Sequence, residues 1–140
     1  MTAQSTATPT SITNMTWTLV ASTLYWLDCD IPVTFTASAT ISFVLSGSGS
    51  PSTVMMEDSG NIGAAGAFQN NSFTALASTW AGTQTATSGA PGAVTTIIHV
   101  SATIGSGASG AGAMSLQTIA NGTNTIQIRA AASCRLTRMD

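Results

Sequence analysis

Few side chains in this sequence could do chemistry, and the only histidine is the first to consider. His99 lies in the stretch TTIIHVSATI, on the polar side of a two-residue alternation that it shares with Ile97. A catalytic triad needs a nucleophile and an orienting acid around such a base, and the sequence has no Gly-x-Ser-x-Gly motif. No second histidine is present to share a metal ion. We therefore expect a surface or interface histidine, in a protein that is not an enzyme.

The acidic residues offer little more. Asp28 and Asp30 flank Cys29 and share one side if the segment is extended, but the loop spacing and glycine of a calcium site are absent. Solvation of a loop is the role we expect for them. Glu57 and Asp58 are adjacent, so a strand would point them to opposite faces, which does not support a paired-carboxylate hydrolase. The sequence predicts no metal ion and no cofactor.

The chain is poor in charge. Charged residues are 6% of its 140 residues, where an ordinary soluble domain carries about 25%. Lysine is absent, the basic residues are Arg129, Arg135 and Arg138, and 24 threonines and 18 serines stand where charges usually do. A net charge of −2 built from so few groups gives little self-repulsion and favours association with protein. Three arginines near one end are not the basic footprint of a nucleic-acid-binding protein.

The sequence predicts neither a membrane partner nor export. Its apolar stretches are interrupted well before the roughly 18 residues of a spanning helix, and the start MTAQSTATPTSIT is neither basic nor apolar. We therefore expect synthesis and folding in a cytoplasm. In that compartment Cys29 and Cys134 are expected to be free thiols rather than a disulfide.

The elements that must position these residues are strands. In residues 33–45 every odd position is apolar, and the stretch is long enough that we expect a bulge or bend. The last stretch, TIQIRAAASCRLTRM, is apolar at even positions from Ile126 to Leu136. About eight such candidates and no capped helical stretch predict an all-β fold. The expected architecture is an antiparallel two-sheet β-sandwich, a jelly roll of about eight strands.

We expect the sandwich to span residues 14–140, preceded by an extended arm over residues 1–13. That arm is polar and broken by Pro9, and two interpretations stay open: a disordered tail, or an arm that drapes over a neighbouring subunit. Pro32 is taken to mark an edge or break. With Trp26 inside, Tyr25 and Leu27 become exposed apolar residues, as does Ile97 beside His99, and such residues suggest a surface covered by another subunit.

The C-terminal part resembles the closing segment of a family of phage virion proteins. In that family a strand leads through a glycine-rich turn to a Gly-x-Leu-x-Leu-Gln strand, then to an Asn-x-Thr-type hairpin and a final x-Ile-x-x-Gly-Ser-x-Leu-x-x-x-Arg strand. The matching residues are Gly112, Met114, Leu116 and Gln117, then Asn121 to Asn124, then Ile128, Ala132, Ser133, Arg135 and Leu136. The stretch FTASATISFVLSG is similar to the family's inner strand.

The resemblance implies a trimeric jelly roll of the tumour-necrosis-factor and complement-globular-head type. It also implies that the terminal strand pairs in the middle of a sheet, with both chain ends on the same side. Arg129 and Arg135 would then face outward or a subunit seam, with Asp140 as one possible partner. Because Ala132-Ser133-Cys134 replaces the family's Gly-Ser, a turn or bulge there is expected to be straightened.

We expect a non-enzymatic phage structural protein that decorates or cements the capsid surface as a homotrimer bound to the major capsid protein. The arm, with Thr2, Pro9 and Ile12, would anchor it. The alternative is the receptor-binding knob of a tail or head fibre that recognises a host glycan. For that function Trp17, Tyr25, Trp26 or Trp80 would have to be exposed in loops.

Overall fold

The computed structural model describes residues 2–4, 10–35, 40–48, 51–61, 68–75, 83–87, 94–121 and 126–139, and these parts of the chain contain strands and turns but no helix. The strands are β1 (Thr2–Gln4), β2 (Thr10–Leu19), β3 (Leu24–Phe35), β4 (Thr40–Gly47), β5 (Pro51–Asn61), β6 (Phe68–Ala75), β7 (Thr83–Thr87), β8 (Val94–Ser106), β9 (Gly112–Asn121), β10 (Ile126–Ile128) and β11 (Ser133–Met139). Every pairing between them is antiparallel.

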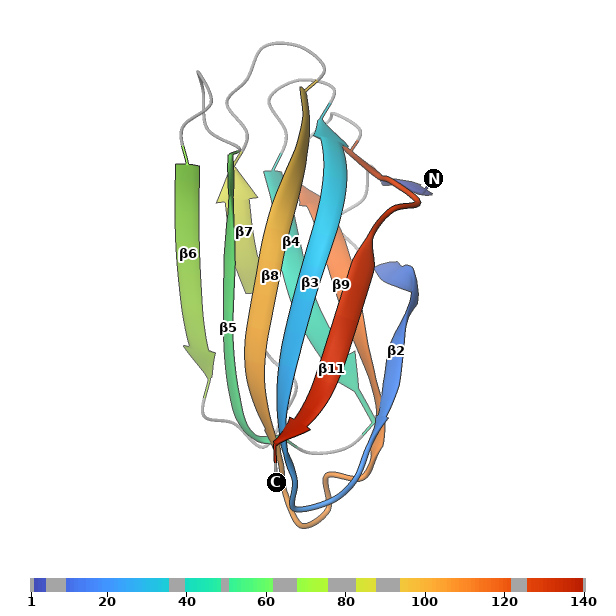
Figure 1. Cartoon of the computed structure of the whole chain (residues 1–140), viewed down its shortest axis with the longest axis vertical. Coiled ribbons are helices and arrows are strands. Elements are labelled where there is room, and N and C mark those ends of the chain that lie inside the picture. The colour runs from blue at the N-terminus through green and yellow to red at the C-terminus, as the bar shows by residue number, and fades with distance from the viewer. Residues whose placement is uncertain are drawn as a thin grey trace.

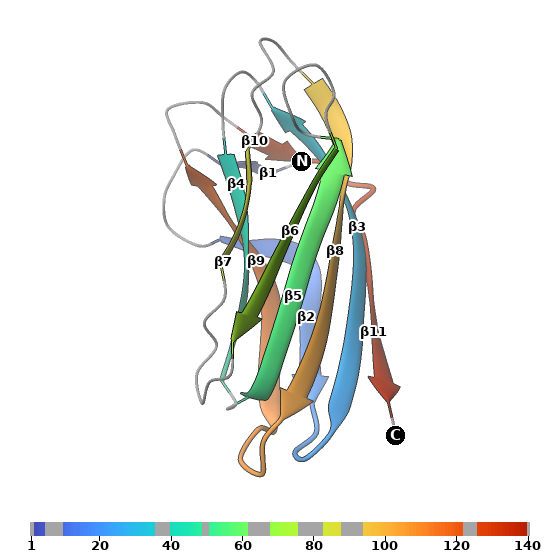
Figure 2. The same ribbon diagram turned by 90° about the vertical axis from the view of Figure 1, so that its left-hand side faces the viewer.

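The strands form two sheets that face each other, as the two views in Figures 1 and 2 show. The larger sheet has seven strands in the order β1-β10-β3-β8-β5-β6, with β11 also paired to β3. The smaller sheet has four strands in the order β2-β9-β4-β7. The expected all-β, two-sheet sandwich with a jelly-roll-like arrangement is therefore confirmed. The described residues contain eleven strands rather than about eight, because the last stretch forms two strands and β1 and β7 are short additional ones.

The core fills the space between the sheets with side chains from both. Its largest fully buried members include Phe35, Leu27 and Ile98 from the larger sheet and Phe43 and Leu116 from the smaller one. Because inward and outward side chains alternate along each strand, this packing also fixes which residues the outer faces display.

The faces of β3 differ from the expectation. The strand runs unbroken through Pro32, and its odd positions from Tyr25 to Phe35 all point into the core. Tyr25 is 5% exposed and Leu27 is fully buried, so the expectation that they form an exposed surface is wrong. The Tyr25 hydroxyl accepts a hydrogen bond from the backbone N–H of Val20 at 2.8 Å, which satisfies its polar end inside the sandwich.

Pro32 does not break β3 because its neighbour is already interrupted. The Pro32 carbonyl accepts a hydrogen bond from the N–H of Arg129, which lies between β10 and β11. In an antiparallel strand the N–H and C=O of one residue point to the same neighbour. The donor that proline lacks therefore faces this interruption, and the pairing with β8 continues on the other side.

The long alternating stretch of residues 33–45 is not one strand. Val33 and Phe35 end β3 in the larger sheet, whereas Ile41 and Phe43 belong to β4 in the smaller one. The alternation is unbroken because both sheets turn their inner faces to one core, so odd positions are buried on either side of the crossing. The expected bend is thus a change of sheet.

The C-terminal stretch is two strands along β3. Ile128 pairs with Val33, and Ser133 pairs with Asp30. The chain therefore advances five residues from Ile128 to Ser133 while β3 advances three, from Val33 to Asp30. The two extra residues form a turn at Ala130–Ala131. An insertion of two residues preserves the alternation, which is why the sequence reads as one strand. The expected straightening of this segment is wrong.

The final strand is also not central. Among the described residues β10 lies between β1 and β3, whereas β11 pairs with β3 alone and forms an edge. Thr2 lies beside Ile128 at one end of β3, and Met139 pairs with Leu24 at the other end. The chain ends therefore lie at opposite ends of the sandwich, contrary to the expectation (Figure 1).

The sandwich begins before residue 14. Ile12 is buried in β2, so the expected arm does not extend through residue 13 and Ile12 is not an exposed anchor. Between Ser11 and Thr16 the pairing with β9 shifts, with five residues on β2 spanning two on β9. Asn14 takes a left-handed φ of 65° in this bulge. The three extra residues switch the buried positions from even, at Ile12, to odd, at Met15.

Candidate functional site: the outer face of the larger sheet

The two sheets differ sharply in charge. The four strands of the smaller sheet contain no Asp, Glu, Lys, Arg or His. Strands β3, β5, β8 and β11 of the larger sheet carry seven of the chain's nine such residues: Asp28, Asp30, Glu57, Asp58, His99, Arg135 and Arg138. A surface whose few ionisable groups gather on one sheet is the strongest candidate for a functional site.

We call the outward-facing side chains of β11, β3, β8 and β5 the charged face. Strand register sets them in rows across these four strands. One row reads Arg135, Asp28, Ser101 and Glu57; the next reads Ser133, Asp30, His99 and Ser59. On one side of these rows lies a third row of Thr137, Trp26, Thr103 and Met55. The face is therefore banded, with charged rows beside a row that contains two large apolar residues.

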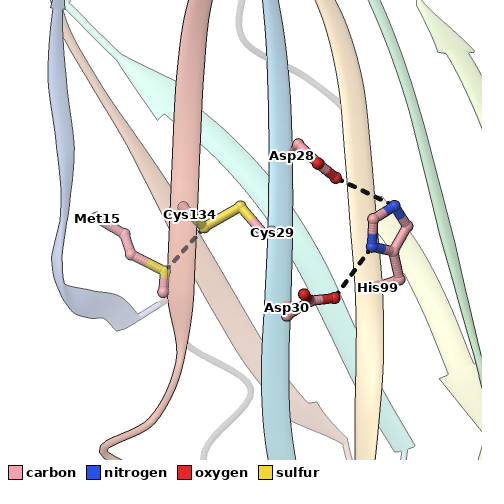
Figure 3. The surroundings of a disulfide bond; sticks show 6 residues. All are labelled: Met15, Asp28, Cys29, Asp30, His99 and Cys134. Carbon is pink, nitrogen blue, oxygen red and sulfur yellow. Dashed lines mark hydrogen bonds and ion pairs between the residues drawn. A yellow bond between two sulfur atoms is a disulfide. The ribbon is translucent and has the colours of Figure 1, made fainter.

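His99 is held between two carboxylates (Figure 3). Its Nε2 lies 3.1 Å from Oδ1 of Asp28, and its Nδ1 lies 3.2 Å from Oδ1 of Asp30. Carboxylates only accept hydrogen bonds, so both contacts are hydrogen bonds together only when the imidazole carries both protons. The two aspartates lie in a strand rather than in the expected loop, and β3 and β8 position all three groups.

Neighbouring polar groups have defined partners. The Ser101 hydroxyl donates to Oε1 of Glu57 at 3.1 Å, linking β8 to β5. Arg129 lies farther along β3, where its Nε donates to Oγ1 of Thr34 at 2.9 Å. Arg135 is exposed beside Asp28. Arg135 therefore faces outward as expected, whereas Arg129 does not, because it is half-buried in a hydrogen bond within its own chain.

Large apolar side chains are exposed beside the charged rows. Trp26 is 39% exposed and Met55 49%, and Leu24 and Met139 continue the apolar band at the same end of the sheet. Ile97 is 58% exposed on β8, two residues from His99. The expected exposure of Ile97 and His99 is thus confirmed. On β3 the exposed aromatic residue is Trp26, whereas Tyr25 and Leu27, which we expected to be exposed, are buried.

Cys29 and Cys134 form a disulfide, and the expectation of free thiols is wrong. They are direct partners in the β3–β11 pair, with Cα atoms 4.0 Å apart, although 105 residues separate them in sequence. The bond lies on the inner side of the sheet, where Sδ of Met15 approaches Cys134 Sγ to 3.4 Å (Figure 3). It ties the edge strand to the centre of the larger sheet. Disulfides of this kind persist in oxidising surroundings, including virion surfaces.

Two hollows flank β11. The larger, of about 280 Å³, lies between the bulge of β2 and the turn from β10 to β11; it is lined mainly by apolar and small residues, with Arg129. The smaller, of about 200 Å³, opens on the charged face between β3 and β11. Its lining consists of Asp28, Cys29, Asp30, Ser133, Cys134 and Arg135.

The structure brings together only part of the expected interface. Ile97, His99 and Arg135 lie on the charged face, whereas Ile12, Tyr25 and Leu27 are in the core. Thr2 belongs to β1, and Pro9, Trp80 and Asp140 lie outside the described residues. The sequence analysis placed Trp26 inside the sandwich, whereas it is exposed in β3, and it missed the pairing of His99 with the two aspartates. Reading residues 24–35 as one strand would have revealed the face of Trp26.

The described parts of the chain hold no group of three or more His, Cys, Asp or Glu residues arranged to bind a metal ion. They also contain no helix long and apolar enough to cross a membrane. Comparison with protein-family models, curated proteins and solved structures finds no match to this chain.

Proposed function

We propose that this protein is a non-enzymatic structural protein of a phage virion, which decorates or cements the capsid by docking its charged face on the major capsid protein. The observation that carries the proposal is the concentration of ionisable side chains, beside the exposed Trp26, on one sheet of a sandwich whose other sheet has four described strands without a charged residue. Interfaces draw their binding energy from a few aromatic and arginine residues. Trp26 and Arg135 are exposed there on neighbouring strands.

Other features support this function. The C-terminal sequence resembles phage virion proteins, and the disulfide suits a protein that works on a particle surface. In this proposal the protein acts as a homotrimer. A decoration protein stabilises a shell because it binds the assembled form more tightly than the separate subunits.

The test is to label purified particles with an antibody to this chain and to locate the label by electron microscopy. Label over the heads, and a higher disruption temperature when the protein is added back to stripped heads, are the expected results. Absence of the label from all particles would overturn the phage assignment.

A second candidate is a receptor-binding knob for a host glycan, and one observation favours it. Trp26 offers an exposed aromatic surface beside Asp28 and Thr137, and sugars stack on aromatic rings while their hydroxyls bond to polar neighbours. Label at the tail tip and binding to immobilised glycans would support the knob. The same experiment thus separates the two functions.

A further inference from the structure

We propose that the charged face pairs with the same face of a second copy of this chain, about a two-fold axis that runs parallel to the strands between β3 and β8. Strands β11, β3, β8 and β5 lie side by side (Figure 1), so this axis sets β3 of one copy against β8 of the other and β11 against β5. The contact covers the docking surface of free copies until a capsid displaces the second copy. That role rests on the proposed docking function, whereas the contact itself does not.

The face has exposed apolar surface for a second copy to cover. In the described parts of the chain six large hydrophobic side chains are exposed, and five of them lie on this face: Leu24, Trp26, Met55, Ile97 and Met139. The sixth, Val20, lies in the turn that leads into β3. Exposed hydrophobic residues that gather in this way mark an interaction surface, whereas scattered single ones do not.

The charged rows are complementary to themselves about this axis. The strand order of the second copy is reversed, so each row meets the same row read backwards. Arg135 therefore faces Glu57 of the second copy, and Asp30 faces its His99. Each of these contacts occurs twice, because a two-fold axis makes the interface isologous.

Other two-fold axes bring like charges together or leave charge unpaired. An axis along β3 sets Asp28 against itself, and one along β8 sets Asp28 against Glu57. An axis across the strands at the charged rows sets at least one aspartate against an aspartate, and one shifted towards the apolar band sets Asp28 against Trp26. Like charges placed opposite each other cost several kcal/mol of binding free energy. Of these arrangements, only the axis between β3 and β8 leaves every carboxylate of the two charged rows opposite a hydroxyl, an imidazole or a guanidinium.

The apolar rows also fit about this axis, because large side chains face smaller or apolar ones. The facing pairs are Trp26 with Thr103, Met55 with Thr137, and Ile97 with Pro32. Alternation of large and small side chains across a contact lets them interdigitate. Two sheets can then approach to about 10 Å with their strands nearly aligned.

The area and net charge of the face make this contact weak. The four strands are about 19 Å across and residues 24–32 extend about 30 Å, or about 600 Å² on each copy, against roughly 800 Å² in a standard interface. Each face also has three carboxylates and one guanidinium at its charged rows, so residual repulsion opposes pairing. We therefore expect pairs to form at about 10–100 µM and to dissociate on dilution. An isologous contact joins two chains, so it is additional to the contacts of the proposed trimer.

Charge-swap variants of the full-length oxidised protein test the inference by sedimentation velocity over about 1–200 µM. We expect the mass of the wild type to rise with concentration. Arg135→Glu puts two acidic groups opposite each other and Glu57→Arg puts two basic groups opposite each other, so each variant alone should associate about tenfold more weakly. An equimolar mixture of the two should associate as strongly as the wild type, because each supplies the charge that the other lacks. Arg138→Glu, on the other side of β11, is the matched control and should associate like the wild type.

A wild type whose mass is constant over this range would overturn the inference. So would single variants that associate as strongly as the wild type, or a mixture that associates no better than its components. Melting temperatures verify folding, and recovery in the mixture requires both variants to be folded.

Stripped heads separate the inference from the proposed function. Added heads should remove the self-associated form from solution, because both contacts use one face; a bound layer two chains deep would contradict the covering role. If the wild type does not bind heads while the charge-swap pattern holds, only the capsid function fails. If it binds heads but does not self-associate, only the inference fails.

Discussion

Side-chain hydroxyl groups stabilise the turn that joins β2 to β3, and the hydroxyl of Ser106 makes the most hydrogen bonds to its backbone. It is 5% exposed; its Oγ accepts from the N–H of Thr23 at 2.9 Å and lies 2.6 Å from the carbonyl oxygen of Val20. Removing the hydroxyl leaves buried backbone groups without a partner. We expect Ser106→Ala to lower the free energy of unfolding by about 1–3 kcal/mol in urea denaturation.

The control is Ser115→Ala, which removes a longer bond of 3.4 Å to the carbonyl of Ser46 from a half-buried position. Its loss should stay below about 1 kcal/mol. If both variants lose the same stability, Ser106 is not the anchor of the turn.

The conformation of Asn14 gives a second test at the residue scale. Its φ of 65° lies in the left-handed region, which asparagine and glycine tolerate and β-branched residues do not. Asn14→Val should therefore lower the free energy of unfolding by about 1–2 kcal/mol, and Asn14→Gly should leave it nearly unchanged. Thermal unfolding measures both. Thr16→Val, at an exposed regular position of the same strand, serves as control, and an equal loss there would attribute the effect to side-chain chemistry.

At the scale of elements, the alternation of residues predicted the sandwich but not its faces. Because Pro32 suggested a break, the buried face of residues 24–31 was predicted separately from that of residues 33–45. The prediction put the even positions in the core, whereas the odd positions are buried. The donor that Pro32 lacks faces the turn between β10 and β11, and no single-strand pattern contains that information. The disulfide was missed because a cytoplasmic compartment predicted free thiols, and the sequence alone does not show that Cys29 and Cys134 become neighbours through the pairing of β3 with β11.

The disulfide makes the edge strand part of the sandwich. It closes a loop of 105 residues, and a cross-link over a loop of that length contributes about 2–5 kcal/mol. We expect the double variant Cys29→Ser/Cys134→Ser to lose stability in this range. Amides of β11 should exchange with solvent faster in the variant, because β3 is the only described neighbour of this strand.

Reductant supplies the internal control for this prediction. It should lower the melting temperature of the wild type towards that of the double variant and leave the variant unchanged. A wild type whose melting temperature does not respond to complete reduction would show that the cross-link adds nothing to the stability of the sandwich.

For the whole molecule, the amino-acid composition does not predict that the ionisable residues lie on one of the two sheets. The net charge of −2 says nothing about where nine ionisable residues lie; the topology gathers β3, β5, β8 and β11 side by side and leaves the other sheet uncharged. Residues 28, 57, 99 and 135 become neighbours only through this strand order. The candidate site therefore depends on long-range pairing, whereas the core depends mostly on local alternation.

This asymmetry predicts that only one face is sensitive to an added charge. Thr103→Arg places a cation between Trp26 and Met55 on the charged face, whereas Thr18→Arg places one on the exposed outer face of the smaller sheet. We expect Thr103→Arg to weaken binding to stripped heads about tenfold or more, because it places a charge in the apolar band of the docking face. Thr18→Arg should bind within about twofold of the wild type. Co-sedimentation measures both, with melting temperatures to verify folding. The opposite ranking would move the docking surface to the uncharged sheet, where its Ser- and Thr-rich strands would have to form the contact.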